Sequence, residues 1–230
     1  MPPSTKNPQL KNWIVVLAKQ PIAGQSKTRL ARDIGVERAQ ALAEAFVLDT
    51  LELTANQADA QVMIAFAPKK AHSWFAEHAP AAELVPQPET TFGERIQAAM
   101  VEAFQRGAER CVVMGMDTPH LGPSTLTSAF AALDQADACI GPSEDGGYYL
   151  VGVREPQPAL FIDIPWSTPA VRSTTLQRAS QAGLRLRELQ LEVDVDDGED
   201  LKALQAILRE RPACAARTRR VLSEQLRQPL

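Results

Sequence analysis

Two patterns of apolar residues alternate along the chain. Residues 13–19, 60–68 and 111–117 are almost continuously apolar, which is typical of strands buried on both faces of a parallel sheet. Between the first two runs, residues 36–57 place apolar side chains on one stripe at helical spacing. The chain therefore begins with a strand, a loop, a long helix and a second strand.

The rest of the chain follows the same two patterns. They predict strands at 83–85, 138–142 and 148–153, an alternating half-exposed strand over 184–196, and helices at 71–77, 93–106, 123–133, 167–183, 198–208 and 212–227. Because strands and helices alternate almost throughout, we expect an α/β sandwich around a mostly parallel sheet. Such sheets bind ligands beyond the carboxyl ends of their strands, so the loops after the strands become the candidate site.

Composition adds limits to this picture. The 230 residues are 45% hydrophobic and 23% charged, which fits one globular domain over residues 1–230, with a flexible start at 1–11 and a helical tail at 212–230. The net charge of −4 argues against a nucleic-acid partner, and no apolar run approaches the ~20 residues of a membrane span. The polar N-terminus lacks a signal-peptide core, so a cytoplasmic location without membrane contact is expected.

The side chains that commonly form nucleophiles or zinc sites are not grouped in this sequence. Cys111, Cys139 and Cys214 lie far apart without a CxxC pair, so zinc and dithiol chemistry are not expected. No Ser/His/Asp or Cys/His set is evident either, and a covalent intermediate is not predicted.

The loop after the first strand carries cationic side chains around a glycine, namely Lys19, Lys27 and Arg29 around Gly24. Backbone amides and cations in such a loop favour phosphate groups. The P-loop pattern fails, because Ser26 and Pro21 stand where it requires glycine. The alternative is a solvated basic turn, although the position at a strand end favours a ligand.

Carboxylates follow three of the later strands. Asp117 ends the most apolar central run, where a charge packs badly but can reach a ligand; the alternative is a helix cap. Asp145 lies in a Glu-Asp-Gly-Gly turn whose glycines, Gly146 and Gly147, allow close backbone approach. A plain β-turn is the alternative there.

A third acidic group spans the start of the helix at 198–208 and comprises Asp194, Asp196, Asp197, Glu199 and Asp200. So many like charges repel each other unless a cation or solvent relieves them. Asp197 is expected to cap this helix, and Glu199 and Asp200 are expected to complement its dipole.

Six segments together resemble the bacterial GT-A-like nucleotide-diphospho-sugar transferases, and more closely the family described as glycosyltransferases or radical-SAM/selenodomain-associated transferases. They are AKQPIAGQSKTRLA, FGERIQAAM, GMDTPHL, GPSEDGGYYLVGV, IPWST and DVDDGEDL. The first is also similar to the corresponding loop of phospholactate guanylyltransferase. The chain departs from its relatives at Asp197-Gly198, where Thr-Pro is usual, and at Thr91-Phe92, where Asp-Leu is common.

The resemblance implies a three-layer α/β/α sandwich and a role for most of the residues above. Asp117 and Asp196 would hold Mg²⁺ (or Mn²⁺), with Asp194 behind them, and Lys27, Asp117 and Asp145 would be catalytic. The nucleotide would contact Ala18, Lys19, Gly24, Lys27, Arg29, Gly93 and Arg95. A small-molecule acceptor would contact Asp145, Gly146, Gly147, Tyr148, Trp166, Ser167 and Thr168; a buried, loop-packing Trp166 is the alternative.

The sequence leaves the reaction open among three possibilities. A nucleotidyltransferase would use a nucleoside triphosphate and release pyrophosphate, and the Lys27/Arg29 loop resembles this class. A glycosyltransferase would use a nucleotide-sugar, as the family description suggests. A non-catalytic nucleotide-binding or scaffold subunit on the same fold is the third alternative. The base, the acceptor and the oligomeric state stay open.

Overall fold

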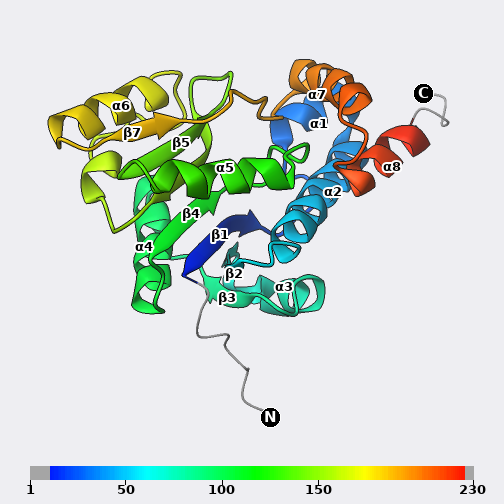
Figure 1. Ribbon diagram of the computed structural model, residues 1–230. Helices are drawn as coiled ribbons and strands as arrows, with labels where there is room; N and C mark the ends of the chain where they lie inside the picture. The colour runs from blue at the N-terminus through cyan, green and yellow to red at the C-terminus, as the bar shows by residue number, and fades with distance from the viewer. Residues whose placement is uncertain (1–10, 226–230) are drawn as a thin grey trace, which may run out of the picture.

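The strands of the protein form one twisted sheet, shown in Figure 1 for a computed structural model that describes residues 11–225. The strands are β1 Asn12–Lys19, β2 Ala60–Ala67, β3 Glu83–Pro86, β4 Arg110–Met114, β5 Ala138–Pro142, β6 Tyr148–Val153 and β7 Leu186–Glu188. Their order across the sheet is β3-β2-β1-β4-β6-β5-β7. Only β6 runs antiparallel to its neighbours among these strands. The mostly parallel α/β sheet predicted from the sequence is confirmed.

Helices cover both faces of this sheet. They are α1 Thr28–Ile34, α2 Val36–Ala55, α3 His72–His78, α4 Phe92–Gln105, α5 Pro123–Leu133, α6 Val171–Gln181, α7 Gly198–Glu210 and α8 Ala216–Gln225, with 3₁₀ turns η1 Lys69–Ala71 and η2 Pro158–Phe161. In β1, Ile14 and Val16 pack in a core with α2, α3 and α5, whereas Trp13 and Val15 pack with α4 and α6. A continuously apolar strand is needed because each face of the sheet meets its own helical layer.

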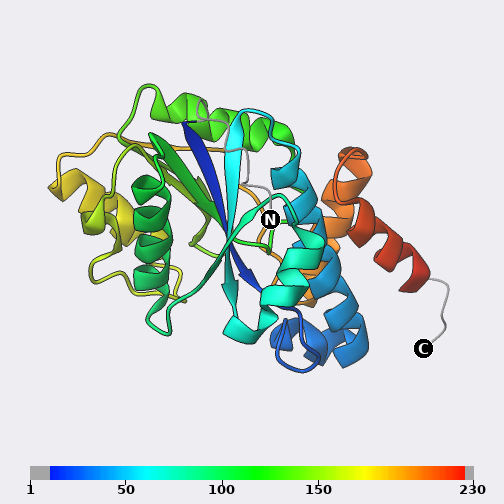
Figure 2. The ribbon, with the colours of Figure 1, turned by 90° about the horizontal axis from the view of Figure 1, so that it is seen from below.

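A third apolar cluster lies beside the sandwich and joins α1, α2, α7 and α8. Figure 2 shows α7 and α8 together next to α2. The Asp49 carboxylate of α2 accepts hydrogen bonds from the backbone N–H groups of Arg217 and Thr218, both at 2.9 Å, and so satisfies donors at the start of α8. The arginine-rich tail therefore packs on its own chain through α8, whose Leu222 is buried in this cluster.

Parts of both terminal segments lie outside the described residues. The flexibility expected for residues 1–11 falls on undescribed residues, apart from Lys11. The carbonyl of Lys11 accepts hydrogen bonds from the N–H groups of Glu109 and Arg110. The last five residues of the tail are also outside the described part. Within residues 11–225, no helix is both long and apolar enough to cross a bilayer.

The strand predicted over 184–196 is wrong for most of its length. Only Leu186–Glu188 joins the sheet, and an isolated bridge pairs Ser143 with Glu192. Beyond that bridge, Val193 and Val195 are buried in the third cluster while Asp194 and Asp196 line cavities on the other side. The alternation in this segment therefore arises because one side packs on helices and the other faces a cavity, and it does not indicate a half-exposed strand.

The long helix predicted at 36–57 is confirmed as α2. A short helix, α1, which the sequence did not predict, precedes it and is separated from it by Gly35, at φ 89°. The helix predicted at 167–183 begins only at Val171, because Ser167 has φ 62°, which a right-handed helix excludes. Its predicted glycine C-cap is confirmed, since Gly183 follows α6 with φ 69°.

Candidate active site

The candidate site forms where three loops meet beyond the carboxyl ends of β1 and β4. These two strands pair in parallel, with Val16 opposite Met114, so the loops that follow them leave the sheet side by side. The backbone N–H of Val195 donates to the carbonyl of Asp117 at 2.9 Å, which draws the segment before α7 against the loop after β4. The structure thus brings together residues that are up to 169 positions apart in the sequence.

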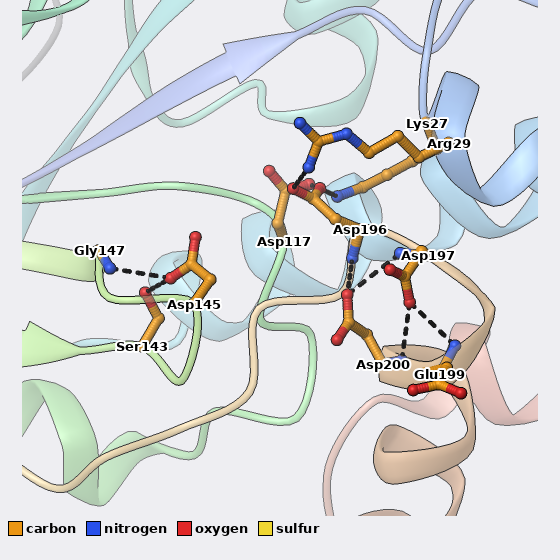
Figure 3. Close-up of polar contacts among 10 residues, drawn as sticks. All are labelled: Lys27, Arg29, Asp117, Ser143, Asp145, Gly147, Asp196, Asp197, Glu199 and Asp200. Atoms are coloured by element: carbon orange, nitrogen blue, oxygen red, sulfur yellow. Dashed lines mark hydrogen bonds and ion pairs between the residues drawn. The ribbon is translucent and has the colours of Figure 1, made fainter. Parts of the chain in front are cut away.

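Lys27 lies at the centre of this junction. Its Nζ atom is 2.6 Å from Oδ1 of Asp117 and 2.9 Å from Oδ1 of Asp196, and the Lys27 side chain is only 8% exposed (Figure 3). Arg29 lies further out, 70% exposed and with Nη1 3.8 Å from Oδ2 of Asp196. The two carboxylates that the resemblance assigns to a metal therefore point at the same place.

The loop that presents Lys27 is held by local hydrogen bonds. The N–H of Ile22 donates to the Ser26 hydroxyl at 3.1 Å, and the N–H of Gln25 donates to the Ile22 carbonyl at 3.0 Å. Gly24 turns the chain with φ 70°, and Lys27 itself adopts the left-handed conformation, φ 48° and ψ 48°, just before α1. This conformation is costly for a residue with a side chain and is typical of functional loops.

The charges in the cluster shift one another strongly. Burial disfavours the charged form of Lys27, but Asp117, Asp196 and Asp194 outweigh it and raise the pKa of its ammonium. For Asp196, burial is outweighed by the charge and hydrogen bond of Lys27, which hold its pKa below the ordinary range. Burial, followed by the charge of Asp117, raises the pKa of Asp194 well above its usual value. Three acidic groups around one buried ammonium make a site suited to further positive charge.

The donor set fits a hard divalent cation. Carboxylate oxygens are the protein ligands that Mg²⁺ and Mn²⁺ prefer, and oxygens of Asp117 and Asp196 already converge on a single cationic atom. Within residues 11–225, however, no group of three or more His, Cys, Asp or Glu side chains is arranged to hold a metal ion. A metal at this place would need oxygen ligands from elsewhere, such as a phosphate.

Two cavities adjoin at these carboxylates. One, of about 320 Å³, is lined by Lys19, Lys27 and Arg29 of the loop and by Met116 and Asp117. The other, of about 630 Å³, shares Arg29, Asp117 and Asp196 with the first. Its other lining residues include most of the expected acceptor residues, namely Asp145, Gly147, Tyr148, Trp166, Ser167 and Thr168. The site thus has a cation-lined compartment and an aromatic, acidic compartment on either side of the Lys27 cluster.

The turn between β5 and β6 fixes Asp145 in the larger cavity. Its Oδ1 atom accepts from the Ser143 hydroxyl at 2.5 Å and from the N–H of Gly147 at 2.9 Å (Figure 3). Gly146 has φ 86°, and a Cβ atom there would lie 2.3 Å from the carbonyl oxygen of Pro169. Gly146 therefore allows the turn to pack on the neighbouring loop, whereas Asp145 and Gly147 line the cavity itself.

An aromatic group closes the same cavity from the side of α4. Trp166 packs on Gly93, where an added Cβ atom would lie 2.8 Å from the indole Nε1. The rings of Phe92 and Tyr148 lie 5.1 and 6.1 Å from that of Trp166, both edge-on. Trp166 thus combines the loop-packing role, left open by the sequence, with a position on the cavity wall.

The expected nucleotide-binding residues separate into different places. Lys19, Lys27 and Arg29 line the smaller cavity, whereas Arg95 lines the larger one, with its guanidinium 5.4 Å from the centre of the Phe92 ring. The remaining three, Ala18, Gly24 and Gly93, line neither of these cavities. Ala18 is fully buried, and its carbonyl accepts from the Gln87 amide at 3.1 Å.

The acidic segment before α7 divides as the sequence predicted for its capping residues. Asp197 caps α7, accepting from the N–H groups of Glu199 and Asp200 at 2.9 and 3.2 Å, and the Asp200 carboxylate in turn accepts from the backbone N–H groups of Asp196 and Asp197. Gly198, which replaces the usual proline, donates its N–H to Asp33 of α1 at 2.8 Å. Proline has no N–H group and could not donate this hydrogen bond. The glycine at position 198 therefore allows α7 to be linked to α1, the helix that follows the Lys27 loop.

Sequence reasoning missed a second buried ion-pair network next to the site. His120 is 1% exposed, and its Nε2 atom lies 3.0 Å from Oε2 of Glu192. Arg211 contacts both carboxylate oxygens of Glu192, at 2.9 and 3.0 Å. No spacing in the sequence pointed to this network, because its members come from three separate segments.

Comparisons with known proteins agree with this architecture. Residues 50–168 match a family described as an uncharacterized protein conserved in bacteria, DUF2064. A phosphoenolpyruvate guanylyltransferase from Conexibacter woesei is 28% identical over 210 residues, covering 88% of this chain and 92% of the relative. A crystal structure of a candidate nucleotide-diphospho-sugar transferase from Desulfovibrio desulfuricans superposes with a TM-score of 0.80 at 31% identity, covering 92% of this chain and 98% of that one.

A more distant structure shares the fold. The manganese complex of a Mycobacterium tuberculosis protein has a TM-score of 0.52 at 19% identity, covering 84% of this chain and 97% of that one. The resemblance and the fold expected from the sequence are confirmed, and the named relatives support a transferase. Since the family match spans just over half of the sequence, the chain belongs to the DUF2064 family of bacterial proteins.

Proposed function

We propose that this chain is a divalent-cation-dependent nucleotidyltransferase that transfers a nucleoside monophosphate from a nucleoside triphosphate to a small-molecule acceptor. The observation that carries the proposal is the Lys27–Asp117–Asp196 cluster at the junction of a cation-lined cavity and a larger second cavity. Such a junction suits a reaction in which charge develops between a donor and an acceptor held on opposite sides.

The donor is assigned to the smaller cavity. Lys19, Lys27 and Arg29 supply cationic groups for the phosphates, and an arginine can grip a phosphate in bidentate fashion. A relative named as a guanylyltransferase supports a nucleoside triphosphate, and GTP in particular, as the donor.

Asp117 and Asp196 are assigned to Mg²⁺ or Mn²⁺. When bound, the cation would neutralise phosphate charge and polarise the phosphorus centre as a Lewis acid. The manganese complex of a structural neighbour supports the choice of a divalent ion. Asp194 lines the same cavity as the two carboxylates, and burial and the charge of Asp117 raise its pKa, which favours its neutral form.

The acceptor is assigned to the larger cavity. An acceptor oxygen attacks the α-phosphorus and forms a new P–O bond, while the bond from that phosphorus to the bridging oxygen breaks and pyrophosphate leaves. The turn fixes Oδ1 of Asp145, so that Oδ2, which points away from the turn in Figure 3, can orient the acceptor. Tyr148, Trp166, Ser167 and Thr168 complete the wall, and Arg95 offers a cation for an acidic acceptor of the phosphoenolpyruvate type.

Transfer of a sugar from a nucleotide-sugar is the second candidate. The similarity to a candidate nucleotide-diphospho-sugar transferase favours it, because that relative is 31% identical over nearly its whole length. The two reactions differ in their leaving groups: nucleotidyl transfer releases pyrophosphate, whereas sugar transfer releases a nucleoside diphosphate.

The experiment measures both leaving groups. The protein is incubated with Mg²⁺ and each nucleoside triphosphate in turn, with phosphoenolpyruvate, phospholactate and a mixture of sugar phosphates as acceptors. Nucleotidyl transfer predicts pyrophosphate release that is lost in Asp117→Asn and kept in Asp59→Asn, which removes an exposed carboxylate outside the site. Release of a nucleoside diphosphate from nucleotide-sugars alone would assign the second candidate.

The non-catalytic alternative has its own signature in the melting temperature. A nucleotide that raises the melting temperature without turnover under any of these conditions supports a binding or scaffold subunit. If no nucleotide shifts the melting temperature, with or without Mg²⁺, both the transferase and the nucleotide-binding alternatives are wrong.

A further inference from the structure

The ammonium of Lys27 lies between Oδ1 of Asp117 and Oδ1 of Asp196, the position that a divalent cation held by these same two oxygens would take. We infer that Lys27 competes with the metal for these two carboxylates, and that the donor's phosphates must draw Lys27 away before the metal binds tightly. This inference rests on the proposed function for the role of the phosphates. Its first consequence, competition between Lys27 and a metal ion, concerns the protein alone.

The geometry of the cluster is the first support. Oδ1 of Asp117 and Oδ1 of Asp196 both contact the same nitrogen, at 2.6 and 2.9 Å, so these oxygens cannot bind a metal ion while the ammonium stays. Lys27 is 8% exposed, whereas the carboxylates are 37% and 45% exposed. The acids can therefore be reached from the crevice although their present partner is buried.

The number of available ligands is the second support. The structure shows no group of three or more metal-ligating side chains within residues 11–225, so the protein offers a metal ion two carboxylates that are already paired. A metal ion arriving alone must break both contacts with Lys27 and complete its coordination with water. A metal ion arriving with a triphosphate brings phosphate oxygens, which can both coordinate it and take over the Lys27 ammonium.

The placement of Lys27 on the loop is the third support. It carries a left-handed backbone, with φ 48°, immediately before α1 and lines the cavity assigned to the phosphates. The same side chain thus reaches both the carboxylates and the phosphate cavity. Lys19 lines that cavity too, yet none of its contacts within the described part of the chain involve Asp117 or Asp196.

The test measures binding of Mn²⁺ alone, by the loss of the free-ion electron paramagnetic resonance signal, in the absence of nucleotide. Lys27→Met should bind Mn²⁺ about tenfold or more tightly than the wild type, because the metal no longer displaces charge-assisted hydrogen bonds. Lys19→Met is the matched control, since it removes one positive charge from the same cavity without freeing the carboxylates. It should change the affinity by only about twofold to threefold, through the screened long-range field.

The double variant Lys27→Met/Asp117→Asn locates the effect. It should lose the gain, because one of the two freed carboxylates is gone. Equal Mn²⁺ affinity in the wild type and Lys27→Met would overturn the competition while leaving the proposed transferase intact. If neither protein binds Mn²⁺ even with a nucleotide present, the metal role of Asp117 and Asp196 in the proposed function is wrong as well.

A second measurement uses the wild type and does not depend on the folding of any variant. Acylation of lysines, followed by mass spectrometry, should show Lys27 becoming more reactive as Mg²⁺ is added, since the displaced ammonium is no longer buried between two acids. Lys11, whose side chain is 64% exposed and, within residues 11–225, paired with Glu109 alone, serves as the internal reference. Unchanged or reduced labelling of Lys27 at saturating Mg²⁺ contradicts the inference.

Discussion

Two ion-pair clusters join the loop after β4 to the segment before α7, and they are built in opposite ways. In the first, the cation Lys27 is buried, and the acids Asp117 and Asp196 are more than one-third exposed. In the second, the acid Glu192 is 5% exposed, and His120 and Arg211 surround it. His120 follows Asp117 by three residues, and Asp196 follows Glu192 by four, so the two clusters are neighbours on the same two segments.

The difference between the two clusters distinguishes a candidate binding site from an ion pair that only stabilises the fold. Both carboxylate oxygens of Glu192 already accept hydrogen bonds from protein groups, which is what a buried charge requires. Asp117 and Asp196 keep part of their surface open, and their shared partner lies on a loop that also lines the smaller cavity. We therefore expect damage to the first cluster to affect function and damage to the second to affect stability.

The largest effect is expected from Asp117→Asn. The amide keeps the shape but removes the charge that would hold a metal ion, so turnover in the transfer assay should fall by about 100-fold or more. The free energy of unfolding should change by no more than about 1 kcal/mol, because Asp117 is partly solvated and its removal relieves repulsion from Asp194. Turnover and urea unfolding are measured on the same preparation. Retained activity would remove Asp117 from the site.

Glu192→Gln is the matching change in the second cluster. It should lower the free energy of unfolding by about 1–3 kcal/mol, since Arg211 and His120 lose a charged acceptor in a buried place. Turnover at a temperature where the variant stays folded should fall by less than about tenfold, because Glu192 lines neither cavity. A loss of turnover as large as that of Asp117→Asn, without lost stability, would erase the distinction between the two clusters.

The same pair of proteins gives a prediction about pH. Burial alone would raise the pKa of Glu192, but the hydrogen bonds and charges of His120 and Arg211 prevail and hold it below the ordinary 4.5. A lowered pKa in the folded state means that Glu192 stabilises the fold above about pH 4.5, and that this stabilisation is lost as the pH falls through the lowered value.

The stability difference between wild type and Glu192→Gln should therefore shrink as the pH falls below about 4.5 and through the lowered pKa of Glu192. Urea unfolding of both proteins from about pH 5 downward measures the difference, which cancels titrating groups that do not contact Glu192. Tyr149, the further titratable group that senses Glu192, has its pKa raised by burial and stays neutral throughout. A difference that grows toward acid would mean that Glu192 is protonated in the native state.

The sandwich was predictable because its strands are apolar on both faces. Trp13 to Val16 alternate between two helical layers, and no other architecture buries so continuous a run so simply. The segment 184–196 misled because alternation reports only that every second side chain is buried. Val193 and Val195 are buried against helices, and the pattern does not distinguish this from burial against a sheet partner.

The part of the candidate site that lies in loops directly after strands could be predicted from the sequence. Loops after parallel strands meet at one edge, which accounts for the positions of Lys27 and Asp117. Asp196 is expected from the family resemblance instead, and the strand predicted to lead to it ends at Glu188. The sequence does not give the contact of one ammonium with both carboxylates, which depends on the left-handed backbone of a single non-glycine residue. Nor does it give the Glu192 network, whose partners are joined only when α7 returns past the loop after β4.

The smallest effect should come from Asp197→Ala, one residue beyond Asp196. Asp197 caps α7 through the N–H groups of Glu199 and Asp200, so its loss should lower the free energy of unfolding by about 1 kcal/mol. Mn²⁺ affinity should stay within about twofold, because the Asp197 side chain lines neither cavity and contacts no atom of Lys27. Urea unfolding and Mn²⁺ titration check the two halves of this prediction. If Asp197→Ala instead weakened Mn²⁺ binding as strongly as Asp196→Asn, the proposed metal-binding group would have to include Asp197, and its role would not be limited to capping α7.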